Sequence, residues 1–205
     1  MRFRLLLLLV AVLVASSASS CIAQQTGRDP APDPKVADLE SSFLMGMIPH
    51  HRDAIAMAQM ALTKSTRPEL RTLAQGIIDS QQAEVEEMTG YLGDWYGLDP
   101  PAGSTIPPDV MSKFSQPVMQ GLEPDMSSEM MALDAKSGAE FDIEFMKAMI
   151  EHHSMAIAMA APVLTSGYHQ DLTTLAENIV ISQGQEIRQM DQWLDAWYGV
   201  TRPYR

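Results

Sequence analysis

The sequence predicts an all-α protein, a four-helix bundle made of two tandem helical hairpins. Two observations lead to this prediction. Residues 43–97 align with residues 145–199 at a constant offset of 102 positions without gaps, and 25 of the 55 aligned positions are identical. In each copy, apolar residues recur at steps of three and four, which is the spacing of one helical face. Two hairpins that each carry one apolar face bury these faces best against each other.

Residues 1–21 have the pattern of an export signal. Two arginines precede an apolar run of eleven residues, which is too short to span a membrane. Small residues then lead to Cys21, the one cysteine of the chain, and residues 18–21 resemble a bacterial lipobox. We expect lipidation of Cys21 after cleavage, which would anchor the protein to the outer face of a membrane in the cell envelope. The alternative is ordinary cleavage after Ala23, which would give a soluble secreted protein.

The rest of the chain divides into four segments. Residues 22–37 contain three prolines and few apolar residues, so we expect a flexible tether. The first hairpin spans residues 38–98 and the second spans residues 139–200. Residues 99–138 link the two hairpins, and we expect a short helix near residues 127–136 within this linker.

Each hairpin is predicted to contain two long helices. In the first copy we expect helices from about residue 36 to 63 and from about residue 69 to 96. Pro49 lies inside the first of these, where its missing N–H should kink the helix or start a new one, whereas the second copy has Glu151 there. Gly97 is a natural end for the second helix.

Polar side chains interrupt the apolar stripes at equivalent places in the two copies. His50 and His152 take core-facing positions on the first helix of each hairpin. Counting residues from the turn places a Gln and a Glu of the second helix level with each of them. These are Gln81 and Glu84 in the first copy and Gln183 and Glu186 in the second. A buried carboxylate is costly unless it finds a cation, a hydrogen bond or a metal.

We expect these positions to form a metal site. Adjacent helical residues point about 100° apart, so one His of each His-His pair should face inward and the other should face a seam between helices. The candidate ligands are Met47, His50, His51, Glu84, Met149, His152, His153 and Glu186. Weaker candidates are Met57, Gln81, Met88, Met159, Gln183 and Met190. The alternative is a polar lock that fixes the register of the bundle. The sequence leaves open whether the two clusters merge into one.

The ligand types favour copper, with iron or zinc as alternatives. Imidazole suits all three metals, whereas thioether selects for Cu(I), and 16 of the 205 residues are methionine. An exported protein meets oxidising conditions, in which thiolate ligands would be lost to disulfides. A di-iron centre in a bundle requires Glu-x-x-His motifs, but Met47 and Met149 stand three residues before His50 and His152.

Composition and motifs narrow the function classes further. The formal net charge of -12 argues against nucleic acid as a partner. The sequence has no Gly-x-Ser-x-Gly, no His-Glu-x-x-His and no phosphate-binding glycine loop. We therefore expect a metal-binding protein rather than an enzyme. A metal-dependent oxidoreductase and a metal-free envelope interaction module are the alternatives. The fifth histidine, His169, falls in a connection and is predicted to be a surface residue.

The paired motifs resemble the signature of domain-of-unknown-function family 305. The resemblance rests on residues 47–57 and 141–159, which contain the two His-His pairs, and on residues 81–88 and 183–190 downstream. It covers about residues 42–199. It implies a ferritin-like four-helix bundle in exported bacterial proteins. Some relatives are implicated in binding copper or silver through Met and His, and no reaction is firmly attached to the family.

Overall fold

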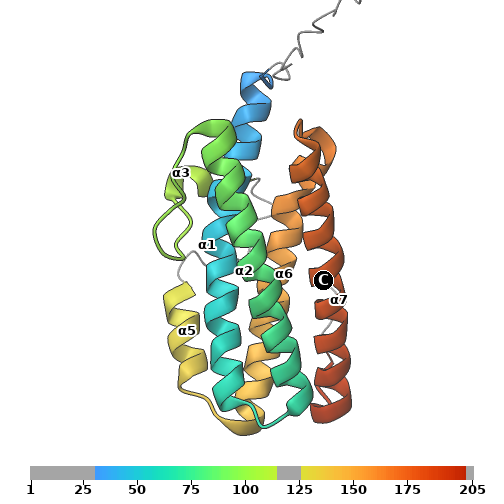
Figure 1. Cartoon of the computed structure of the whole chain (residues 1–205). Helices are drawn as coiled ribbons and strands as arrows, with labels where there is room; N and C mark the ends of the chain where they lie inside the picture. The colour runs from blue at the N-terminus through green and yellow to red at the C-terminus, as the bar shows by residue number, and fades with distance from the viewer. Residues whose placement is uncertain (1–30, 115–125, 202–205) are drawn as a thin grey trace, which may run out of the picture. The chain divides into compact units, whose positions relative to one another are not determined.

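The computed structural model describes residues 31–114 and 126–201, and all regular secondary structure in these residues is helical (Figure 1). The elements are α1 (Pro34–Lys64), α2 (Pro68–Tyr96), α3 (Pro108–Met111), α5 (Met126–Asp134), α6 (Gly138–Ser166) and α7 (Gln170–Tyr198). The predicted all-α class with two helical hairpins is confirmed. The predicted signal segment and the lipidation site Cys21 lie outside the described residues.

The helix ends follow from local sequence. α1 begins at Pro34, inside the stretch expected to be a tether, because Asp33 caps it by accepting a hydrogen bond from the backbone N–H of Lys35 at 2.9 Å. α2 and α7 end at Gly97 and Gly199, which adopt left-handed φ angles of 64° and 62°. Glycine takes this conformation without the steric penalty of a Cβ atom.

The helix α1 continues through Pro49 without a break. Of the two predicted outcomes, the start of a new helix is therefore wrong, and a kink at Pro49 stays a prediction. Proline removes one backbone donor, but Pro49 and its neighbours Ile48 and His50 are buried against the rest of the bundle. Packing of this long buried face holds the helix together across a single lost hydrogen bond.

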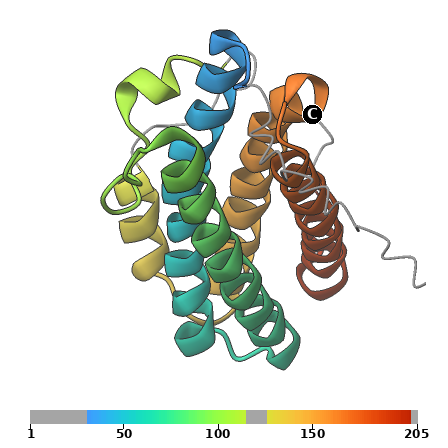
Figure 2. The ribbon, with the colours of Figure 1, turned by 45° about the horizontal axis from the view of Figure 1, so that its top comes forward.

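The four long helices form a bundle in which the first helix of each hairpin lies at the centre. α1 packs along α2, and α6 packs along α7. The two hairpins join mainly through α1 and α6, whereas α2 and α7 make few contacts with each other (Figure 2). The linker helices α3 and α5 pack on α1, and α5 also packs on α6. None of the described helices is long and apolar enough to cross a membrane.

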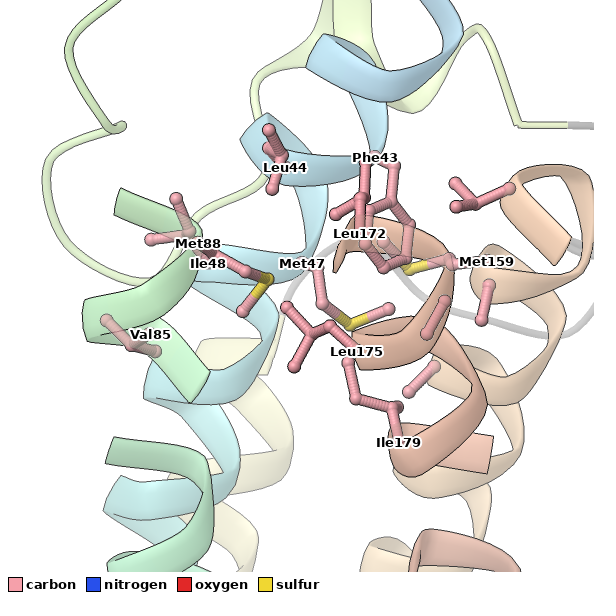
Figure 3. Packing of buried hydrophobic residues seen from close by; sticks show 14 of the residues in the cluster. Phe43, Leu44, Met47, Ile48, Val85, Met88, Met159, Leu172, Leu175 and Ile179 are labelled. Atoms are coloured by element: carbon pink, nitrogen blue, oxygen red, sulfur yellow. The ribbon is translucent and has the colours of Figure 1, made fainter. Parts of the chain in front are cut away.

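Two apolar cores fill the bundle, one on each side of its middle. The first joins the N-terminal half of α1 to the C-terminal half of α6, so the two helices run antiparallel (Figure 3). The second joins the C-terminal half of α1 to the N-terminal half of α6. The repeat relates the two cores, since Phe43 and Met47 in the first correspond to Phe145 and Met149 in the second. The polar positions of both copies therefore meet between the cores.

Candidate metal centre

A layer of polar side chains lies at mid-height between the two cores, and His50 and His152 form its centre. Their ring centroids are 3.7 Å apart, with the rings tilted by 38°. The two residues are 2% and 3% exposed. Because α1 and α6 cross at this point, the clusters of the two hairpins come together, which the sequence left open.

The second histidine of each pair turns toward the neighbouring helix of its own hairpin. The Nε2 atom of His51 lies 2.8 Å from a carboxylate oxygen of Glu84, and that of His153 lies 2.7 Å from Glu186. Both rings are fully buried, whereas the two carboxylates are 15% and 18% exposed. Counting residues from the turn correctly predicted that each glutamate lies at the height of a histidine pair. It associated the carboxylate with the first histidine of each pair, whereas in the structure the carboxylate contacts the second.

The layer contains many buried polar atoms without a hydrogen-bond partner among the described residues. They are both ring nitrogens of His50 and His152, the Nδ1 atoms of His51 and His153, and the side-chain amides of Gln81 and Gln183. Leaving a buried donor or acceptor unsatisfied costs about 1–3 kcal/mol. In a polar lock, the side chains of the layer would form hydrogen bonds with one another. Because these side chains lack such bonds, the layer is suited to binding an additional ion or molecule.

The two central imidazoles are held in the form that binds metals. Burial lowers the pKa of His50 and of His152 well below 6.5, and repulsion from the neighbouring histidines lowers it further. Both rings are therefore neutral at pH 7. A neutral imidazole has a free lone pair on one nitrogen, which is the group that coordinates a metal ion.

Thioethers flank the layer on both sides. Met47 lies in the first core, one turn before His50, and its sulfur is directed toward α7 near Leu175 (Figure 3). Met149 occupies the equivalent place in the second core. The weaker candidates Met57, Met88, Met159 and Met190 are also buried and belong to the two cores. Met57 and Met159 stand two turns from the histidines, roughly 10 Å along the helix.

The polar layer brings together pairs of histidine and glutamate side chains rather than a larger set. No group of three or more His, Cys, Asp or Glu side chains there is placed to hold a metal ion. The imidazoles of His50 and His152, together with the thioethers of Met47 and Met149 in the adjoining cores, form the nearby donor set. This donor set suits the soft ions Cu(I) and Ag(I) better than iron, and copper better than zinc.

A second polar cluster lies at one end of the bundle, and sequence reasoning missed it. Glu40 is fully buried and accepts hydrogen bonds from the hydroxyl of Tyr96 (2.6 Å) and from the backbone N–H groups of Tyr168 (2.7 Å) and His169 (2.9 Å). The Nδ1 atom of His169 lies 2.7 Å from the same carboxylate. Glu40 stands three residues before Phe43 on the apolar stripe of the helix, and this position could have indicated from the sequence that Glu40 is buried.

This end cluster ties the start of α7 to α1. The prediction that His169 is a surface residue is wrong, because its ring stacks on Trp95 with centroids 3.9 Å apart and its side chain is 21% exposed. Burial alone would raise the pKa of Glu40, but the hydrogen bonds from Tyr96, His169 and Tyr168 outweigh it and lower the pKa. Since its carboxylate is already fully engaged, we assign Glu40 a structural role.

Comparison with known proteins places this arrangement in a family. Residues 40–194 match the domain of unknown function DUF305. The chain belongs to this family. It is similar to CopM in the Cu(I)-bound form, with 37% sequence identity and a TM-score of 0.62 over 78% of this chain and 98% of that chain. CopM also has structures in Cu(II)-bound, Ag-bound and apo forms.

Two further relatives extend the comparison. A DUF305 protein from Streptomyces coelicolor is 26% identical, with a TM-score of 0.66 over 82% of this DUF305 chain and 98% of that one. The uncharacterized protein L153 of Acanthamoeba polyphaga mimivirus is 40% identical over 55 residues. That match covers 27% of this chain and 36% of the viral protein.

Proposed function

We propose that this DUF305 protein binds copper as Cu(I) in the cell envelope and serves copper tolerance, storage or hand-over. One observation carries the proposal. The middle of the bundle holds two neutral imidazoles whose ring nitrogens are buried and without partners, and a buried methionine lies one turn before each. The Cu(I)-bound and Ag-bound structures of CopM, at 36–37% identity, support the same choice of metal.

The proposal gives the residues of the layer different roles. His50 and His152 are the central ligands, because their rings lie 3.7 Å apart and their buried nitrogens have no partner among the described residues. Met47 and Met149 supply the soft donors that favour Cu(I) over Zn(II). His51 and His153 are outer ligands, each oriented by the carboxylate that it contacts, as ligand histidines commonly are. Gln81 and Gln183 are buried, and their side-chain amides have no hydrogen-bond partner among the described residues.

Export and membrane anchoring complete the proposal. The positive start, the short apolar run and the lone Cys21 after small residues support cleavage and lipidation on the outer face of the membrane. An anchored protein with a Met and His site would hold Cu(I) where thiolate sites are lost to oxidation.

A competition titration tests copper binding. The purified soluble domain, kept under reducing conditions, is titrated with Cu(I) against a chromophoric Cu(I) chelator. We expect a dissociation constant below about 1 μM, which corresponds to roughly 8 kcal/mol of binding free energy. His50→Ala combined with His152→Ala should remove tight binding, while His169→Ala, which changes a histidine outside the layer, should keep it. Binding weaker than micromolar, or binding that the double substitution leaves unchanged, would overturn the proposal.

A further inference from the structure

The negative charge of the protein is concentrated on two of its four long helices. α2 carries six acidic residues against one arginine, and α7 carries five against one arginine. α6 carries four acidic residues against one lysine, and α1 carries three acidic and three basic residues. α2 and α7 therefore account for nine of the twelve net negative charges of the chain.

These two acidic helices are also the ones that the described linker leaves uncovered. α3 packs on α1, and α5 packs on α1 and α6 (Figure 1). α2 and α7 make few contacts with each other, and two ring contacts join them at their ends. Trp95 of α2 stacks on His169 at the start of α7, and the Arg67 guanidinium lies 4.7 Å from the ring centroid of Trp197. The two helices are therefore in contact at both ends of the seam between them.

Glu84 stands eleven residues, about three turns, before Trp95, so it lies on the face of α2 that Trp95 turns toward α7. Glu186 stands eleven residues before Trp197 and lies in the same way on the face of α7 that is turned toward α2. Each carboxylate is partly exposed, at 15% and 18%, yet contacts a fully buried imidazole, that of His51 or His153. The same two imidazoles present unpartnered Nδ1 atoms inside the bundle. The two carboxylates are thus the members of the layer that touch both solvent and buried ligand groups.

We propose that the α2–α7 seam is the path by which a soft monovalent cation reaches the layer, and that Glu84 and Glu186 receive the ion first and pass it to the imidazoles. This proposal rests on the proposed function. The net negative charge of α2 and α7 attracts cations toward these helices, and electrostatic steering of this kind raises association rates by about 10–1,000-fold. Carboxylate oxygens are hard ligands and hold Cu(I) or Ag(I) weakly, so an ion received there moves on to nitrogen and sulfur.

Rapid mixing with Ag(I) ions tests whether Glu84 and Glu186 serve the entry of the ion or act as ligands of the bound ion. Wild-type protein and Ag(I) are mixed, excess chelator traps the unbound ion at set times, and release into chelator gives the dissociation rate. Glu84→Gln combined with Glu186→Gln keeps the side-chain shape and an acceptor for His51 and His153. We expect association at least about tenfold slower, with the dissociation rate changed by less than about threefold. Association by the wild-type protein should also slow as salt is added.

A matched control removes the same charge elsewhere. Glu140→Gln combined with Glu144→Gln on α6 also removes two negative charges, and we expect association to change by less than about twofold. Unchanged association in the Glu84 and Glu186 variant, a change confined to dissociation, or equal slowing in the control would each overturn the path. If the double variant does not fold, the single Glu84→Gln variant and the salt dependence of the wild type decide in the same way. Absence of Ag(I) and Cu(I) binding by the wild type would instead overturn the proposed function.

Discussion

His50 and His152 are the residues in which sequence, burial and chemistry meet. Each stands on an apolar helical stripe, is almost fully buried, and has no hydrogen-bond partner for either ring nitrogen among the described residues. Burial of such groups costs free energy, so their presence at equivalent places in both copies requires a compensating role. Binding of a soft metal ion is the role that the neighbouring thioethers favour.

The buried histidines predict a pH dependence of stability. The pKa of His50 and His152 is lowered in the folded protein, so below pH 6.5 the unfolded chain binds more protons. The free energy of unfolding must therefore fall as the pH drops below about 6.5, by up to about 1.4 kcal/mol per pH unit for each histidine. Burial raises the pKa of Asp53 to about 6, so protonation of Asp53 increases the free energy of unfolding below pH 6 and partly offsets the effect of the histidines.

Urea unfolding of the metal-free protein between pH 7.5 and 5.5 measures this dependence. We expect a net loss of stability toward pH 5.5, since two histidines outweigh one aspartate. His50→Gln combined with His152→Gln should flatten the curve. Stability that stays constant or rises toward pH 5.5 in the unsubstituted protein would contradict the account of the two histidines.

The methionines nearest the layer should control affinity for soft ions. Met47→Leu combined with Met149→Leu conserves volume, so the fold should lose less than about 1.5 kcal/mol per site. We expect Cu(I) affinity in the chelator competition to fall at least about tenfold, because the thioether donors are gone. The matched control makes the same change two turns away, as Met57→Leu combined with Met159→Leu. An equal loss of affinity in the control would show that core packing, and not ligation, is responsible.

At the scale of the helices, the two copies differ in how the start of the second helix is secured. Glu40 of α1 accepts two backbone N–H bonds at the start of α7 as well as the Tyr96 hydroxyl. Its equivalent on α6, Asp142, accepts the Tyr198 hydroxyl at 2.8 Å, and its other oxygen has no partner among the described residues. The shorter aspartate side chain makes fewer of these bonds, so the two ends of the bundle differ in strength.

Substitution of these two carboxylates tests that difference. Glu40→Gln would turn an amide N–H₂ toward donors and leave at least one of them unsatisfied, at a cost of about 1–3 kcal/mol. Asp142→Asn should cost less, since a single hydroxyl bond is affected. Urea unfolding of both variants at pH 7 gives the comparison. A larger loss for Asp142→Asn would be inconsistent with the role given to Glu40.

The long helices could be predicted closely from the sequence, because their signals are local. Expected bounds of 36–63 and 69–96 compare with Pro34–Lys64 and Pro68–Tyr96. Periodic apolar residues and a terminal glycine are enough for this. Whether α1 continues through Pro49 or a new helix starts there was not predictable, because this depends on tertiary packing around Pro49.

The residues of the candidate site could be predicted from the sequence, but the contacts between them could not. The positions of His and Glu at the same height follow from counting residues from the turn. Which histidine meets the carboxylate depends on helix rotation, and one residue changes the direction by about 100°. That His50 and His152 meet depends on how the hairpins pack, which local patterns do not encode. The environment of Glu40 and His169 was missed because it joins segments about 130 residues apart.

At the scale of the whole molecule, the duplication explains why the two hairpins share one polar layer. A pseudo-twofold relation places each hairpin's inward histidine against its counterpart from the other hairpin, with one apolar core on each side. An ion bound there would contact both hairpins at once. The acidic helices α2 and α7 carry the two partly exposed carboxylates that contact buried histidines of the layer.

X-ray absorption at the copper edge tests the central claim most directly. The purified protein is loaded with one equivalent of Cu(I), and the fine structure is compared with that of His50→Ala combined with His152→Ala. We predict both imidazole nitrogen and thioether sulfur as neighbours of copper, with the imidazole signal lost in the variant. A copper environment without sulfur, or a spectrum that the double substitution leaves unchanged, would contradict the claim that the buried histidine layer binds the metal.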